Sequence, residues 1–70
     1  MMEIFEHIRP EVKTTAEGAW ELTMASASHN PIKAAELLNT IVEYYKVLWT
    51  QEEVEFLQFY FRMKMEMMDK

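Results

Sequence analysis

The chain has 70 residues, half of them hydrophobic, and its 12 acidic and 7 basic side chains give a net charge of −5. This length allows one domain, residues 1–70, and the absence of cysteine excludes disulfides and cysteine-based zinc sites. The hydrophobic content excludes an intrinsically disordered chain, and the negative charge disfavours direct binding to nucleic-acid phosphates.

The first ten residues, MMEIFEHIRP, lack the cationic start and apolar core of a signal peptide. No stretch has the roughly 20 uncharged apolar residues that a membrane span requires, so we expect a cytoplasmic protein. Ile4, Phe5 and Ile8 predict a short N-terminal arm, either one helical turn or an extended segment. Pro10 is expected to separate this arm from the rest of the chain, because proline interrupts helices.

A first helix is expected over about residues 11–28. Thr14 followed by Glu17 matches a capping box, which favours a helix start near Thr14. Gly18 disfavours helix formation by about 1 kcal/mol relative to alanine. The apolar stripe of this helix consists of Ala16, Ala19, Trp20, Met24 and Ala27.

A second helix is expected over about residues 31–48. Asn30 can cap it, and Pro31 suits its first position, where an amide hydrogen would have no partner within the helix. Most apolar side chains fall on one half of the helical cylinder, and most charged side chains fall on the other. The apolar half contains Pro31, Ala34, Ala35, Leu37, Leu38, Ile41, Val42, Tyr44, Tyr45, Leu48 and Trp49.

A third helix is expected over about residues 51–68, because Thr50 and Glu53 match a second capping box. Only a few residues separate it from the second helix, so these two helices should form an antiparallel hairpin. The predicted fold is therefore all-α, a small three-helix bundle built on this hairpin, with the first helix packed across it and a short N-terminal arm.

The third helix has more apolar surface than a small bundle needs. Its apolar side chains cover about 240° of the circumference, whereas a core-facing stripe needs little more than about 100°. A first seam consists of Val54, Leu57, Phe61, Met65 and Met68. A second seam consists of Phe56, Tyr60, Met63 and Met67, with Phe59 at its border. The sequence does not decide which seam faces the second helix.

Three interpretations of this surplus remain open. The first helix covers the spare seam within a monomer, two copies pair symmetrically through the third helix, or a seam binds another protein, to which flexible methionines are suited. We expect a homodimeric protein–protein interaction module that inhibits or regulates a larger protein complex sterically. The residues expected to bind the partner are Phe56, Phe59, Tyr60, Met63 and Met67.

The acidic side chains suggest an alternative function. A nucleic-acid-mimicking decoy, for example a phage-encoded anti-defence protein, would block a DNA- or RNA-binding site, an analogy based on size and charge alone. Its acidic surface would consist of Glu17, Glu21, Glu36, Glu43, Glu55 and Glu66. Lysine and arginine interrupt two of these faces, which favours ordinary solvated helix faces instead. An oligomeric structural or assembly component is a further alternative.

No residues indicate catalysis or metal binding. Thioethers are soft ligands for Cu(I), but Met63 and Met65 point apart on a helix. His7 and His29 lack local partners, so we expect His7 on the arm and His29 at a helix boundary. Lys64 lies within the apolar arc, and its stem is expected to follow apolar surface with its amine in water. With no catalytic motif and little interior, we expect no enzyme, no cofactor and no small-molecule substrate.

Overall fold

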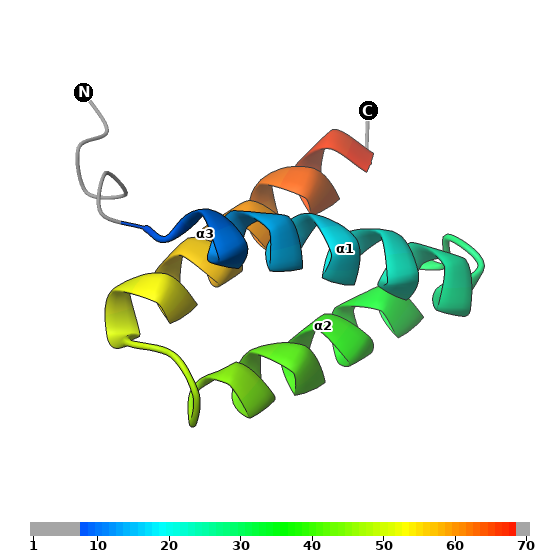
Figure 1. Cartoon of the computed structure of the whole chain (residues 1–70). Coiled ribbons are helices and arrows are strands. Elements are labelled where there is room, and N and C mark those ends of the chain that lie inside the picture. The colour runs from blue at the N-terminus through cyan, green and yellow to red at the C-terminus, as the bar shows by residue number, and fades with distance from the viewer. Residues whose placement is uncertain (1–7, 69–70) are drawn as a thin grey trace.

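Three α-helices, α1 (Pro10–Ala27), α2 (Pro31–Tyr45) and α3 (Gln51–Met68), form the computed structural model, which describes residues 8–68. α1 and α2 run antiparallel, and α3 turns back from α2 and passes behind α1 (Figure 1). Each helix packs against the other two. The predicted all-α three-helix bundle is therefore confirmed. The predicted positions of Ile4, Phe5 and His7 lie outside the described residues.

The start of α1 differs from the prediction. The helix begins at Pro10, where the missing amide hydrogen has no helical partner to lose. Thr14 lies inside the helix, and its hydroxyl donates a hydrogen bond of 3.2 Å to the carbonyl of Pro10. The predicted capping box of Thr14 and Glu17 is therefore wrong, because the helix already begins at Pro10.

The turn between α1 and α2 is tight and well capped. Ser28 and His29 adopt left-handed backbone conformations with φ of 53° and 61°, which end α1 without a glycine. The side-chain oxygen of Asn30 then accepts hydrogen bonds from the amides of Ile32 and Lys33, at 2.9 and 3.2 Å. The predicted cap of α2 and the boundary position of His29 are both confirmed.

α2 ends at Tyr45, three residues before the expected end at 48. The amides of Leu48 and Trp49 both donate to the carbonyl of Tyr45, at 3.1 and 2.9 Å, so the chain tightens into a turn. The Trp49 ring stacks on Tyr45 with 4.1 Å between the ring centroids. This inward position of Trp49 leaves Leu48 exposed, although it was expected on the apolar half of the helix.

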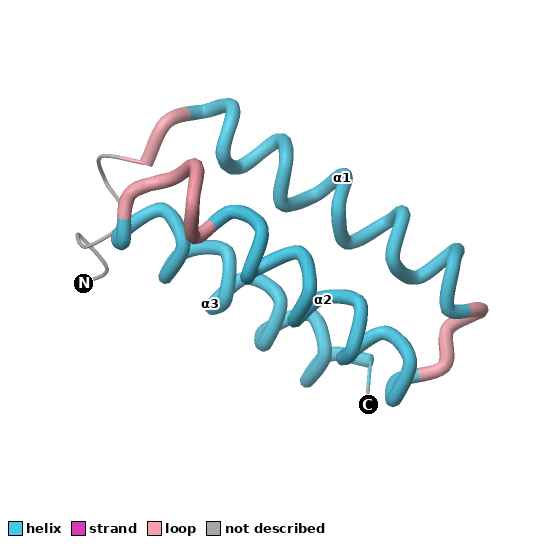
Figure 2. Tube along the Cα trace, turned by 90° about the horizontal axis from the view of Figure 1, so that it is seen from below, coloured by secondary structure: helices cyan, strands magenta, loops and turns pink. Residues whose placement is uncertain are grey.

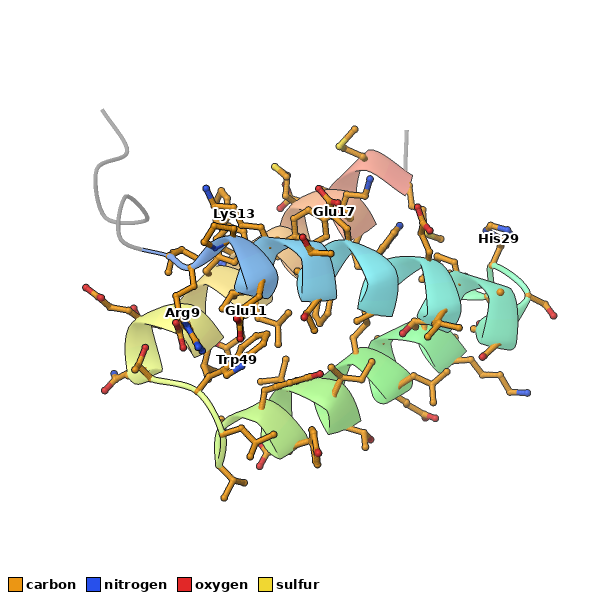
Figure 3. The ribbon with its side chains drawn as sticks, viewed as in Figure 1. Arg9, Glu11, Lys13, Glu17, His29 and Trp49 are labelled. Carbon is orange, nitrogen blue, oxygen red and sulfur yellow. The ribbon has the colours of Figure 1, made fainter. Side chains whose placement is uncertain are left out.

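The predicted capping box of α3 is confirmed and joins α1 to α3. The Thr50 hydroxyl accepts the amide of Glu53 at 3.3 Å, and the Glu53 carboxylate accepts the amide of Thr50 at 3.2 Å. The Arg9 guanidinium also donates to both oxygens of Glu53, at 2.7 and 3.1 Å. Figure 3 shows Arg9 and Glu11 at the end of the bundle where the turn after α2 carries Trp49. The starts of α1 and α3 are thus held together by an ion pair with a buried carboxylate.

The core lies between the three helices and decides between the two seams of α3. Val54, Leu57 and Phe61 of the first seam are buried, with Met65 and Met68 packed beside them. The other buried members of the core cluster are Ala16, Trp20, Met24, Ala27, Ala34, Leu38 and Val42. The molecule is thin, because its Cα atoms span only 15 Å along the shortest axis. The buried side chains lie on one face of each helix.

Candidate interaction surfaces

The residues predicted to bind a partner divide into two groups in the structure. Phe56 and Tyr60 are half-buried and pack against the core, with 6.2 Å between their ring centroids. Phe59, Met63 and Met67 remain 39–62% exposed. We call these three exposed residues the α3 strip. They follow one another at intervals of four, so they line one side of the helix.

α1 lies close to Tyr60 of the second seam. Burial raises the pKa of the Tyr60 hydroxyl, and the nearby charges of Glu17 and Glu21 on α1 raise it further. The Lys64 ammonium lies 5.8 Å from the ring centroid of Trp20 and 5.9 Å from that of Tyr60. Lys64 therefore follows apolar surface, as expected, with its charge over two aromatic rings. The first helix thus lies over part of the apolar surface that appeared spare in the sequence.

A second apolar surface lies between α1 and α2 and was not predicted. α1 runs alongside α2 (Figure 2), and between them are two hollows of about 610 and 270 Å³. The hollows share Leu22, Thr40 and Ile41, so they form one continuous groove. We call this the α1–α2 groove. Its lining consists of Thr15, Gly18, Ala19, Leu22, Thr23, Ser26, Leu37, Thr40, Ile41, Tyr44 and Tyr45.

Small residues form the α1 side of this groove, and large apolar side chains stand at its rims. A Cβ atom built on Gly18 would meet no atom within 4 Å, so the space above Gly18 is open. Leu22 on α1 is 72% exposed and Tyr44 on α2 is 61% exposed, and Leu37 is exposed beside them. Side chains this apolar are usually covered when they are grouped together. The groove therefore has the shape and chemistry of a docking surface.

The electrostatics of the groove differ from those of the rest of the surface. Its lining contains no acidic or basic side chain. By contrast, the hollow of about 320 Å³ between α2 and α3 is bordered by Arg62, Asn39 and Gln58. A partner that fills the α1–α2 groove must therefore present uncharged apolar surface, because a charged group would lose its hydration there without gaining a counter-charge.

The six acidic residues of the alternative function are all exposed, but they come from three helices. Glu17 points away from α2, as Figure 3 shows, and Glu21 follows it one helical turn later on α1. Glu43 pairs with Lys46 at 3.0 Å, and Glu55 accepts a hydrogen bond from Gln51. The remaining two, on α2 and α3, are Glu36 and Glu66. These acids therefore do not form a single negative row.

The described residues offer no evident reactive centre. Within residues 8–68, no three histidine or acidic side chains come together in a way that could hold a metal ion. In the same range every buried side-chain nitrogen and oxygen has a hydrogen-bond partner, so no buried polar group points unpaired into a hollow. None of the three helices is long and apolar enough to cross a bilayer. The chemistry that these surfaces support is the burial of apolar area.

One sequence signal could have revealed the groove. The apolar half of α2 includes Leu37 and Tyr44 at one edge and Ala35 at the other, and this arc is wider than a single contact with α3 can cover. Ala34 and Leu38 are buried in the core between the three helices. Leu37 and Tyr44 are exposed beside small residues of α1. Comparisons of the chain with protein-family models, curated proteins and solved structures found no match.

Proposed function

We propose that this protein is a small protein–protein interaction module that acts as a homodimer and sterically inhibits or regulates a larger protein complex. The observation that carries the proposal is the amount of apolar surface exposed by so short a chain. Nine large apolar side chains among residues 8–68 are at least 39% exposed. Several of these side chains lie together on the α3 strip or along the α1–α2 groove. Exposed apolar side chains that lie together mark interaction sites.

The free energy available from burying the α3 strip supports the use of more than one surface. The exposed fractions of Phe59, Met63 and Met67 together equal about one and a half fully exposed side chains. Full burial of a large apolar side chain contributes about 1.5–3 kcal/mol, so the strip offers about 2–4 kcal/mol per copy. Association costs about 4–15 kcal/mol in lost rigid-body freedom. Contact through the strip alone is therefore weak, and a stable complex must also bury surface elsewhere.

The mechanism is the occupation of a partner's surface by a folded helical face. Phe59 supplies a rigid aromatic anchor, whereas Met63 and Met67 have flexible thioether side chains that adapt to an irregular partner. The net charge of −5 keeps such a protein soluble despite its apolar patches. The dispersed acids give less support to a nucleic-acid mimic, since a mimic needs rows of one sign.

The test is the solution mass of the full chain across a wide concentration range, measured by light scattering at low and at moderate salt. We expect the mass to rise from 8.4 kDa to twice that value with little effect of salt, because apolar contacts are not screened. A mass that stays at 8.4 kDa at every concentration would refute the homodimer. Association that weakens steeply with salt would favour charge-driven contacts instead.

A further inference from the structure

We infer that Met63 and Met67 form an oxidation site, at which a peroxide converts the apolar α3 strip into a polar surface and leaves the fold intact. The modification goes beyond the proposed function, because it changes the chemistry of the strip whatever the strip contacts. It depends only on how exposed these two side chains are and how they are spaced along α3, so it does not rest on the homodimer.

The described methionines differ widely in their access to solvent. Met24 is only 5% exposed and belongs to the core cluster, and Met65 and Met68 are partly buried against the same cluster. Met63 and Met67 lie outside that cluster and are 39% and 62% exposed. A peroxide must reach the sulfur atom to react, so it can attack Met63 and Met67 in the folded chain, whereas it reaches Met24 only when the helices open.

The reaction needs no catalytic group from the protein. The thioether sulfur attacks one oxygen of hydrogen peroxide, the O–O bond breaks and an S–O bond forms. The released hydroxide takes the proton that remains on the transferred oxygen, which yields a sulfoxide and water. The sulfur is oxidised by two electrons and the peroxide is reduced by two. Access to the sulfur therefore decides which methionine reacts.

The spacing of the two residues concentrates the change on one side of α3. Met63 and Met67 are four positions apart, so their side chains are neighbours on the helix surface. A sulfoxide is polar, and its oxygen accepts hydrogen bonds from water. Two sulfoxides leave Phe59 as the one apolar member of the three-residue α3 strip, so an apolar surface becomes a mostly polar one.

The fold should tolerate this change because both modified side chains already face solvent. Neither residue belongs to the core cluster or to the side chains packed against it. The new oxygens therefore meet water, which solvates them. Oxidation of Met24 would have the opposite effect, since a polar oxygen in the core would lose its hydration without gaining a hydrogen bond.

Under the proposed function, this modification is a means of regulation. Contact with a partner through the α3 strip uses flexible apolar thioether side chains, and sulfoxides at Met63 and Met67 would weaken it. This consequence rests on the proposed function, whereas the selectivity of the reaction does not. A chain that never dimerises would refute the homodimer and leave the oxidation site unaffected.

The first experiment measures the oxidation rate of each methionine. The full chain is treated at neutral pH with dilute hydrogen peroxide and analysed over time by peptide mass spectrometry. The protein is kept dilute, so that self-association does not shield the α3 strip. We expect Met63 and Met67 to react at least about tenfold faster than Met24. The control is the same reaction in concentrated urea, where the unfolded chain should show similar rates at all three positions.

A second experiment tests the effect on the surface and on the fold. Hydrophobic interaction chromatography retains folded proteins by their exposed apolar area, so the chain oxidised at Met63 and Met67 should elute earlier than the unmodified chain. Its urea midpoint should be unchanged. The control is the double variant Met63→Leu, Met67→Leu, which keeps an apolar strip without sulfur and should lose most of the shift in elution. Treatment with a methionine sulfoxide reductase should reverse the shift.

Three results would overturn the inference. Equal oxidation rates of Met24 and Met67 in the folded chain would show that burial does not select the reacting sulfur. An equal shift in elution for the double variant would place the change in surface elsewhere on the chain. A lowered urea midpoint after oxidation at Met63 and Met67 alone would show that these side chains support the fold.

Discussion

Glu53 is expected to contribute more to stability than any other charged side chain in the described part of the molecule. Its buried carboxylate accepts hydrogen bonds from the Arg9 guanidinium and from the amide of Thr50. Loss of a helix cap typically costs about 1 kcal/mol, and a hydrogen bond to a charged group contributes about 1.5–3 kcal/mol. The hydrogen bonds between Arg9 and Glu53 should contribute an amount in the lower part of this last range, because the guanidinium is half exposed and screened by water.

Glu53→Ala should therefore lower the free energy of unfolding by about 2 kcal/mol, a large fraction of the roughly 4–10 kcal/mol typical of 70 residues. Urea denaturation followed by circular dichroism at neutral pH measures this change directly. Glu55→Ala is the matched control, because Glu55 is exposed on the same helix and should change the free energy of unfolding by less than about 0.5 kcal/mol.

The pH dependence isolates the charge of Glu53 from its capping role. Hydrogen bonds from Arg9 hold the pKa of the Glu53 carboxyl below its usual range, and the Thr50 amide adds to this effect. The stabilisation is therefore complete above the unfolded-state pKa of about 4.3, and it is lost as the pH falls through the lower folded-state pKa. Glutamine can still accept the Thr50 amide, so Glu53→Gln should be less stable than the unmodified chain at neutral pH only.

Two results would refute this account of Glu53. An unchanged urea midpoint for Glu53→Ala at neutral pH would mean that neither the ion pair nor the cap contributes measurably. A difference between Glu53→Gln and the unmodified chain that persists in strong acid would mean that charge is not the cause.

Two further predictions concern packing and the ionisation of Tyr60. Leu57→Ala should lower the free energy of unfolding by about 2–5 kcal/mol because Leu57 is fully enclosed, whereas Met67→Ala should change it by less than about 0.5 kcal/mol; equal effects in urea denaturation would contradict the assignment of the core. Burial raises the pKa of the Tyr60 hydroxyl, so its contribution to stability is complete below the unfolded-state pKa of about 10 and is lost as the pH rises through the higher folded-state pKa. Tyr60→Phe should therefore lose less stability in alkali than the unmodified chain, and identical alkaline profiles for the two proteins would show that Tyr60 does not titrate in this way.

Local sequence signals predicted the helix ends that depend on nearby side chains. The Asn30 cap and the Thr50–Glu53 capping box both formed, because each needs only a few consecutive residues to bond to one another. The match at Thr14 and Glu17 was equally good in the sequence, but Pro10 began the helix four residues earlier. Because the helix begins at Pro10, the amide that Thr14 would cap already has a carbonyl partner within the helix.

Long-range contacts account for what could not be predicted. Arg9 pairs with Glu53 across 44 positions, and nothing in either local sequence indicates the other as its partner. The early end of α2 likewise depends on Trp49 stacking on Tyr45 before the chain enters α3. The prediction differed most from the structure in where the apolar side chains are exposed. Tyr60 lies against α1, whereas Leu22 and Tyr44 are exposed.

Local patterns in the sequence were enough to predict three amphipathic helices and to indicate an apolar surplus on the third. Helical periodicity and caps are local properties, and each helix contains them in full. Which apolar residues are left exposed depends on how the three helices pack together. That choice depends on how the small residues of α1, including Gly18, meet α2, because small side chains leave open the space that larger ones would have filled.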